Sequence, residues 1–229
     1  AQSIKNPRTE KQMAQRIKFG MAQKFVKVMT AYLQAGFRNY TQHQTATNAA
    51  MSHTVRNCMA GKYPAFGIDP SKVLVSSGSL MPGRFCTVKV EDNVATFSWE
   101  DNSDESHAAV DDFAMPLIYN FTKGEAVFTT EDASRVDCKA TLKLPADWSG
   151  DLLSCYIAFA SVQNNSVSNS VYVGDVKSDG SVEQGANGIL YNDGVIDKGD
   201  TGGGGSTPTT PGGGSSSGGG NPSGDGTIE

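Results

Sequence analysis

Apolar positions in the first part of the chain follow the period of an α-helix. They recur at three- and four-residue spacing and comprise Met13, Ile17, Met21, Phe25, Val28, Met29 and Tyr32. This spacing predicts one apolar face on a long helix. Two starts are open: Asn6 as the cap with Pro7 at the first helical position, or a capping box from Thr9 to Gln12 one turn later. The predicted stop is Gly36.

A second helix is predicted after Thr45 or Asn48, because either side chain suits a helix N-terminus. Its apolar face comprises Ala50, Met51, Val55, Cys58 and Met59, and Gly61 ends it. The two helices are predicted to form a basic hairpin over residues 1–62. Two helices make only a thin core, so this hairpin must pack against the β-rich part of the chain or against another copy.

Beyond the helices the pattern changes to the period of β-strands. Residues 85–91 and 94–100 alternate apolar and polar side chains on either side of Asp92 and Asn93, which predicts a β-hairpin. Further strands are predicted at 72–76, 114–121, 125–130, 136–144, 152–161 and 167–173. The first of these lies in a connector, residues 63–81.

Residues 82–176 are therefore predicted to form an antiparallel β-sandwich of the immunoglobulin or fibronectin type, since turns separate the strands roughly every 8 to 12 residues. With the helices ahead of it, this makes the fold class α+β. The Cys…Trp…Cys spacing of antibody domains is not met, so the likeness is one of architecture.

Residues 177–229 are predicted to form a disordered tail or linker. Glycine, serine, threonine and proline dominate from Gly199 to the end of the chain, and such a segment buries too little apolar surface to offset its ordering entropy. Two small apolar clusters, at 189–191 and 195–196, form either a loose hairpin or no regular structure.

Charge divides the 229-residue chain into two parts. Residues 1–80 hold eleven Lys and Arg against two acids, a net charge of +9, whereas residues 81–229 hold eight against twenty-two, a net charge of −14. The split indicates either two surfaces with different partners or a solvated basic helix beside an acidic domain. The candidate docking surface comprises Lys11, Arg16, Lys18, Lys24 and Lys27.

No pattern in the sequence indicates catalysis, and neither a cofactor nor a metal is expected. The four cysteines contain no CxxC pair and have no His at ligand spacing, so we interpret them as small buried apolar residues. His43, His53 and His107 stand without a nucleophile and an orienting group nearby in sequence. Trp99 and Trp148 are predicted to be core residues.

An acidic loop after residue 100 is the best candidate for ligand binding, with Asp101, Asn102, Asp104 and Glu105 as the residues concerned. Oxygen-rich loops suit calcium, but the spacing fails that of an EF-hand because Ser106 stands where glycine is required. The alternative is an acidic loop that is simply solvated. Nucleic-acid binding is not expected, since no aromatic residues alternate with the cations of the first helix.

No segment of the sequence has the length and apolar character of a membrane helix, and the first 30 residues do not resemble a signal peptide. The chain begins at Ala1, which indicates processing or trimming, so export stays open. An extracellular, cell-surface or virion location is favoured over the cytoplasm.

Seven stretches of the chain carry a resemblance to known sequences: residues 6–10, 15–19, 35–37, 63–66, 74–80, 97–102 and 168–174. Together they resemble a family of uncharacterised proteins from gut Bacteroidetes and their mobile elements. The resemblance covers roughly residues 5–176 and implies a helical N-terminal part joined to an immunoglobulin-like part, with no catalytic residue to carry over. Members of that family usually have a Gly-rich segment ahead of the Asn-Pro-Arg stretch that begins at Asn6, which also suggests trimming here.

The sequence favours a non-enzymatic structural or interaction protein. In this hypothesis the helical part docks the chain into an assembly, such as a virion or surface appendage, and the sandwich is presented for contacts. Protein partners or self-association are therefore expected. The alternative hypothesis is a module that binds a glycan or another cell-surface ligand through the sandwich loops.

Overall fold

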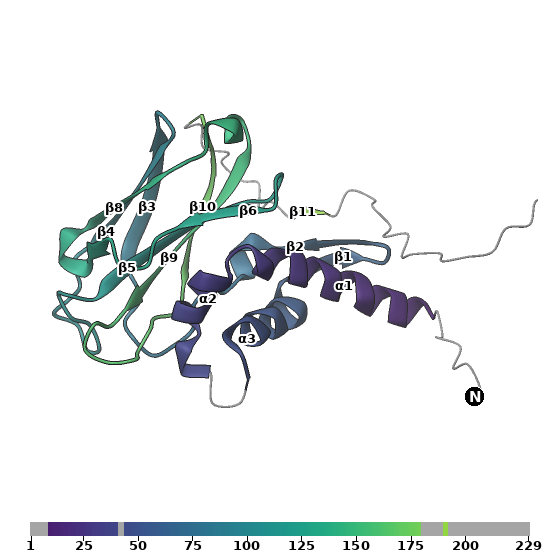
Figure 1. Ribbon diagram of the computed structural model, residues 1–229, viewed down its shortest axis with the longest axis horizontal. Helices are drawn as coiled ribbons and strands as arrows, with labels where there is room; N and C mark the ends of the chain where they lie inside the picture. Colours follow the sequence, from purple (N-terminus) through teal and green to yellow (C-terminus); the bar gives the residue numbers. More distant parts are fainter. Residues whose placement is uncertain (1–8, 41–43, 180–189, 192–229) are drawn as a thin grey trace, which may run out of the picture. The chain divides into compact units, whose positions relative to one another are not determined.

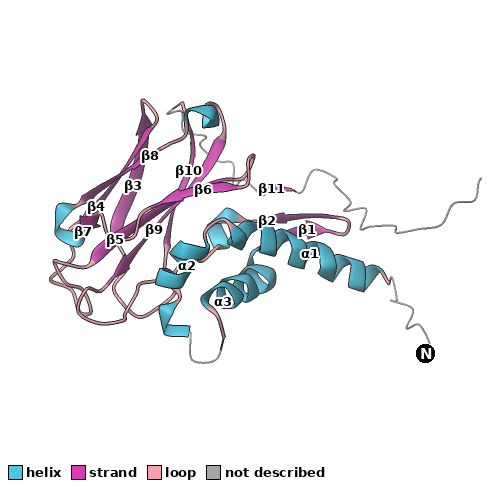
Figure 2. Ribbon diagram, in the orientation of Figure 1, coloured by secondary structure: helices cyan, strands magenta, loops and turns pink. Residues whose placement is uncertain are grey.

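The computed structural model describes residues 9–40, 44–179 and 190–191. The α-helices come first along the chain and the antiparallel strands follow, with short helical turns between some of the strands (Figure 1 and Figure 2). The helical elements are α1 (Glu10–Lys27), α2 (Thr30–Gly36), α3 (Ala46–His53) and the short helices η1 (Arg38–Tyr40), η2 (Thr54–Cys58), η3 (Pro70–Lys72), η4 (Arg135–Asp137) and η5 (Ala146–Trp148). The expectations for Asn6, Pro7, His43 and most of the glycine-rich tail lie outside the described residues.

Three sheets contain the strands. A five-stranded sheet has the order β10 (Val171–Lys177), β9 (Leu152–Ala160), β5 (Phe113–Asn120) and β6 (Glu125–Phe128), with β7 (Ala133–Ser134) also paired to β5. A second sheet has the order β3 (Arg84–Glu91), β4 (Val94–Glu100), β8 (Lys139–Lys143). A third has the order β1 (Met59–Lys62), β2 (Ala65–Ile68), β11 (Leu190–Tyr191).

The first helix begins where the capping box was predicted. The Thr9 side chain accepts from the Gln12 N–H, and the Gln12 side chain accepts from the Thr9 N–H. The helix is not continuous to Gly36, because it breaks at Val28 and Met29 into α1 and α2. The second predicted helix is capped by Thr45 and runs through α3 and η2.

Three predicted boundaries are wrong, each because a local turn or pairing replaces the expected element. Met59 does not continue the second helix, since β1 pairs with β2 in a hairpin. The strand at 72–76 is replaced by η3, which Asp69 caps and Pro70 begins, and by an irregular segment. Strand β8 starts at Lys139, because residues 135–137 form η4.

The hairpin of β3 and β4 is confirmed. Asp92 and Asn93 both have positive φ, at 50° and 59°, which is the backbone of a tight two-residue turn. Alternate residues of β4 are buried, as the period-two pattern predicted: Ala95, Phe97 and Trp99.

The five-stranded sheet is buried on both faces. Its two central strands, β5 and β9, are almost continuously apolar, so both of their faces favour burial. On one face Ala114, Ile118, Cys155, Ile157 and Phe159 pack against the β3–β4–β8 sheet. On the other face Met115, Leu117, Tyr119, Tyr156 and Ala158 pack against the helices. The result is three layers, in which the helices lie on the sheet face that is turned away from the smaller sheet (Figure 1).

The helices are thus packed against the β-rich part of this same chain, which is one of the two alternatives that the thin helical core left open. Phe25 contacts Tyr119 and Phe121, with ring centroids 4.6 and 5.7 Å apart. Tyr32, fully buried, donates a 2.8 Å hydrogen bond from its hydroxyl to the Met115 carbonyl oxygen. The apolar face of α1 and α2 is therefore occupied by the protein's own sheet.

Candidate functional site

The five cations of the candidate docking surface do not share one side of α1. Arg16, Lys24 and Lys27 are exposed on the side opposite the buried residues, at positions set by the 3.6-residue period. Lys11 and Lys18 lie on the same side as the buried Phe25 and Met29, but nearer the start of the helix. Lys18 is partly buried, with Nζ 4.7 Å from the centre of the Phe66 ring on β2.

The outer face of α1, defined by Arg16, Lys24 and Lys27, is flanked by Phe19. That ring is 51% exposed and stands three residues after Arg16, so the two are neighbours on the helix surface. Phe25, on the inner side, is only 3% exposed. Basic and aromatic groups therefore remain accessible on a helix whose other side is anchored.

The acidic loop after β4 contains one residue that points inward. Asn102 is 2% exposed, and its Nδ2 donates to the Pro82 carbonyl oxygen at 3.2 Å and to Glu105 Oε2 at 3.3 Å. Asp101 and Asp104 are exposed. Asp101 accepts a hydrogen bond from the Ser103 N–H, and the hydrogen bonds from Ser103 lower the pKa of its carboxyl group. Within the predicted ligand loop, Asp101 and Asp104 are therefore accessible to solvent, whereas the Asn102 side chain is turned into the protein.

Arg135 is the residue that organises this loop. Its side chain is fully buried, and its Nε donates to Asp112 Oδ2 at 3.1 Å while Nη1 donates to Asn102 Oδ1 at 2.7 Å. Nη2 donates to the Met81 carbonyl oxygen at 2.8 Å, and the guanidinium carbon lies 4.1 Å from the centre of the Phe159 ring. The sequence analysis missed Arg135, since nothing in a single sequence distinguishes a buried arginine from an exposed one.

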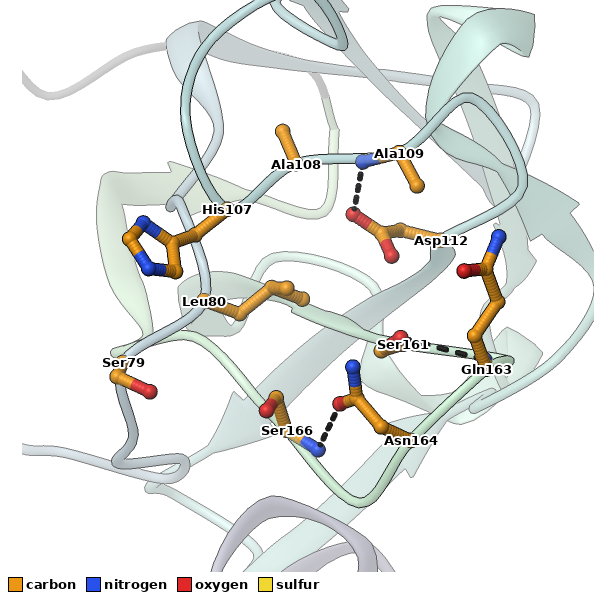
Figure 3. A pocket seen from close by; sticks show the side chains of 10 residues that line it. All are labelled: Ser79, Leu80, His107, Ala108, Ala109, Asp112, Ser161, Gln163, Asn164 and Ser166. Carbon is orange, nitrogen blue, oxygen red and sulfur yellow. Dashed lines mark hydrogen bonds between the residues drawn. The ribbon is translucent and has the colours of Figure 1, made fainter.

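A polar pocket of about 160 Å³ lies between three segments that are distant in sequence (Figure 3). Its lining comes from residues 79–80, from the end of the acidic loop and from the turn between β9 and β10: Ser79, Leu80, His107, Ala108, Ala109, Asp112, Ser161, Gln163, Asn164 and Ser166. None of the loop residues singled out from the sequence, Asp101, Asn102, Asp104 and Glu105, belongs to this lining. The lining residues come together only through the fold.

Both walls of the pocket are held by an arginine. Arg135 holds the Asp112 wall, as described above. Arg38, which follows α2, holds the other wall by donating to backbone carbonyl oxygens of residues 161, 164, 165 and 166, at 3.1, 3.4, 3.0 and 2.6 Å. Four carbonyl groups thus converge on one guanidinium, which ties the turn after β9 to the segment that follows α2.

The groups that could support catalysis are dispersed. His53 contacts the Lys72 carbonyl oxygen and the Asn57 amide, while His107 Nδ1 lies 2.8 Å from Ser106 Oγ. The four cysteines are free thiols, and burial raises the pKa of Cys58 to about 12 and that of Cys86 to about 11. Thiols with such raised pKa values are poor nucleophiles near neutral pH.

Over the described ranges, no group of three or more His, Cys, Asp or Glu side chains is placed to hold a metal ion. Trp99 and Trp148, predicted to be core residues, are 5% and 1% exposed, which confirms that prediction. Their indole N–H groups donate to the Arg135 carbonyl oxygen and to Glu125 Oε2.

Among the residues that the structure describes, none of the helices has the length and apolar character needed to cross a lipid bilayer.

These features define a chain of helices and antiparallel sheets with loops gathered around a polar pocket. The model of a family of unknown function, DUF6266, matches residues 1–174, and the chain belongs to that family. Among solved structures it is similar to the fn3 domain of the human collagen alpha-1(XX) chain, with 12% sequence identity and a TM-score of 0.32. That alignment covers 48% of this chain and 95% of the collagen domain. A comparison with curated proteins finds no match.

Proposed function

We propose that this chain is a non-enzymatic structural or interaction protein that docks into a larger assembly through the outer face of α1. The observation that carries the proposal is the two-sided character of this helix. One side is anchored by Phe25 and Met29 in the core, while the other presents three exposed cations beside the exposed Phe19. A helix held in this way presents its charges in a defined arrangement, which favours recognition of an acidic surface.

The partner surface is acidic, and another copy of the chain offers one. Residues 81–229 carry a net charge of −14, opposite in sign to the +9 of residues 1–80. Copies can therefore contact one another head to tail, with the helical part of one against the sandwich of the next. We extend the proposal to a virion or a surface appendage, because the resemblance described for the sequence is to proteins of gut Bacteroidetes and their mobile elements.

The proposal is tested by light scattering coupled to size exclusion, at low and at high salt. We expect the protein to associate at low salt and to dissociate at high salt, because the Debye length falls from about 30 Å at 0.01 M to about 3 Å at 1 M. The double variant Lys24→Glu with Lys27→Glu is expected to remain monomeric. Its matched control, Lys139→Glu with Lys143→Glu, makes the same charge change on exposed positions of β8. A monodisperse monomer over a wide range of concentration and salt would contradict the proposal.

A second candidate function is the binding of a glycan or another cell-surface ligand by the sandwich loops. The observation that favours it is the polar pocket, in which the acidic loop meets the turn between β9 and β10. Arg38 and Arg135 hold its two walls, so the pocket exists before a ligand arrives. A preformed pocket limits the ordering that binding would require.

A further inference from the structure

We propose that the pocket lined by Asp112 binds a single six-membered sugar ring, with a sugar hydroxyl donating to Asp112 Oδ1. This inference rests on the second candidate function and specifies its ligand class and its residues. It follows from the hydrogen-bonding state of Asp112, from the size of the pocket and from the groups that line it.

Asp112 has one oxygen in use and one without a partner. Oδ2 accepts from the Ala109 N–H at 2.9 Å and from Arg135 Nε at 3.1 Å. Oδ1 is buried and receives no hydrogen bond from the described residues. In Figure 3 this second oxygen points towards the middle of the ring of lining side chains. An unpaired buried acceptor is unfavourable, so a donor that enters the pocket removes that penalty.

The charge around Asp112 favours a neutral donor over a cation. The carboxylate is already paired with the guanidinium of Arg135, which is fully buried. An ammonium ion would have to lose its hydration beside a carboxylate whose charge is already balanced, and burying an unbalanced charge is strongly unfavourable. A hydroxyl group donates the same hydrogen bond without this desolvation penalty.

The size and the lining fit a small ring that carries many hydroxyl groups. A cavity of about 150 Å³ holds a benzene ring, and this pocket measures about 160 Å³ and opens to solvent. It therefore has room for part of a sugar ring, while the remaining hydroxyl groups stay in water. Its walls combine the amide groups of Gln163 and Asn164 with the hydroxyl groups of Ser79 and Ser166, so both donors and acceptors are present. Leu80 and Ala108 supply apolar contact for the carbon atoms of the ring.

No Trp, Tyr or Phe belongs to the set of described residues that line the pocket. Binding therefore depends on hydrogen bonds and on the aliphatic contacts of Leu80 and Ala108, without an aromatic platform beneath the sugar. We expect a dissociation constant on the order of millimolar for a monosaccharide, as is usual for a small polar ligand.

The test is a titration of the uniformly ¹⁵N-labelled full chain, followed by the shifts of its amide signals. The probes are glucose, galactose, mannose and N-acetylglucosamine, each up to roughly 100 mM, well above a millimolar dissociation constant. Methylammonium is titrated in parallel as the cationic probe. For at least one sugar we expect saturable shifts at the N–H groups of Ala109 and Gln163, and none with methylammonium.

Three variants locate the site. Asp112→Asn and Asn164→Ala are each expected to weaken binding about tenfold or more. In Asp112→Asn the amide oxygen takes the hydrogen bonds from Ala109 and Arg135, so an N–H₂ donor replaces the acceptor at Oδ1. Asn164→Ala removes a side-chain amide from the pocket lining. Asn165→Ala is the matched control, since it is the next residue on the same turn, is exposed and does not line the pocket. The sugar affinity of Asn165→Ala is expected to stay within about twofold of the wild-type value. Loss of one hydrogen bond would change the affinity by more than this. If Asp112→Asn does not fold, Asn164→Ala and Gln163→Ala carry the comparison.

Three outcomes overturn the proposal. They are the absence of saturable shifts with any sugar, binding of methylammonium in place of sugars, and equal weakening by Asn164→Ala and Asn165→Ala. Saturable sugar shifts confined to residues 101–106 would support glycan binding by the sandwich loops but would contradict binding in the pocket. Docking through α1 is measured separately by light scattering, so the two proposals fail independently.

Discussion

Arg135 joins three parts of the β-rich region through a single side chain. It is fully buried and bonds to the acidic loop through Asn102, to the start of β5 through Asp112 and to the segment before β3 through Met81. A buried arginine is tolerated only where its charge and its donors are matched, and here both conditions are met.

Replacing Arg135 with Met is expected to lower the free energy of unfolding by about 3–5 kcal/mol, because Asp112 would be left as an unpaired buried charge. The matched control is Arg84→Met. Arg84 forms exposed pairs with Glu100 and Glu105, and its loss should change the free energy of unfolding by at most about 1 kcal/mol. Chemical denaturation of both variants makes the comparison, and similar losses would contradict the assigned role of Arg135.

Asp69 gives the protein a measurable dependence of stability on acid pH. Burial acts to raise the pKa of its carboxyl group, but hydrogen bonds from Lys72 and Ser71 outweigh burial, so the pKa is lowered in the folded state. A group with a lowered folded pKa stabilises the fold above its unfolded pKa of about 3.9, and this stabilisation is lost as the pH falls through the folded pKa. Asp69→Asn should therefore lower stability at neutral pH and flatten its decline below about pH 4.

Measuring the free energy of unfolding from pH 7 down to acid pH tests this prediction. Asp104→Asn is the control, because it makes the same substitution at an exposed position, and it should leave the pH profile unchanged. Identical pH profiles for wild type and Asp69→Asn would contradict the role of Asp69.

At the scale of the element, the two halves of α1 pack against different parts of the protein. Its C-terminal half enters the core through Phe25 and Val26, and the chain bends at Met29 so that α2 can follow the sheet. The N-terminal half lies beside the β1–β2 hairpin, where Lys18 contacts Phe66 (Figure 1). The same helix is thus a core element at one end and a presented surface along its outer side.

Two phenylalanines on α1 separate these roles. Phe25→Ala is expected to lower the free energy of unfolding by about 3–5 kcal/mol, because it opens a cavity beside Tyr119 and Phe121. Phe19→Ala, at a ring that is 51% exposed, should change stability by less than about 0.5 kcal/mol and weaken association instead. Thermal unfolding and light scattering on both variants distinguish the roles, and equal destabilisation would mean that Phe19 is part of the core.

At the scale of the whole molecule, the helices and the β3–β4–β8 sheet pack on opposite faces of the same five-stranded sheet. The central sheet has one apolar face covered by the smaller sheet and the other covered by the helices. The helical part is therefore not an independent hairpin attached to a finished sandwich, and removing it exposes Met115, Leu117, Tyr119, Tyr156 and Ala158.

A chain reduced to residues 80–179 is expected to bind the dye ANS and to lose cooperative thermal unfolding, because a large apolar face is left in water. The matched control is residues 1–195, which retain both layers that cover the sheet. This control should unfold in a single transition like the full chain. A cooperatively unfolding 80–179 fragment without ANS binding would show that the sandwich is complete without its helices.

Local patterns determined much of the element structure. The capping box at Thr9, the cap at Thr45 and the turn at Asp92 and Asn93 are short-range features, in which the side chains and backbone preferences involved lie within a few residues of one another. The strands predicted at 114–121 and 152–161 likewise correspond to β5 and β9.

Only the tertiary structure decided which residues meet. Arg135 and Asp112 are 23 residues apart and Arg38 and Ser166 are 128 apart, so no local pattern could link them. The same limit explains why the buried Asn102 was grouped with the exposed residues of its loop. It also explains why five cations that lie on two different sides of α1 were grouped into one docking surface. Sequence spacing determines where a side chain leaves the backbone, but burial depends on what packs there from elsewhere in the chain.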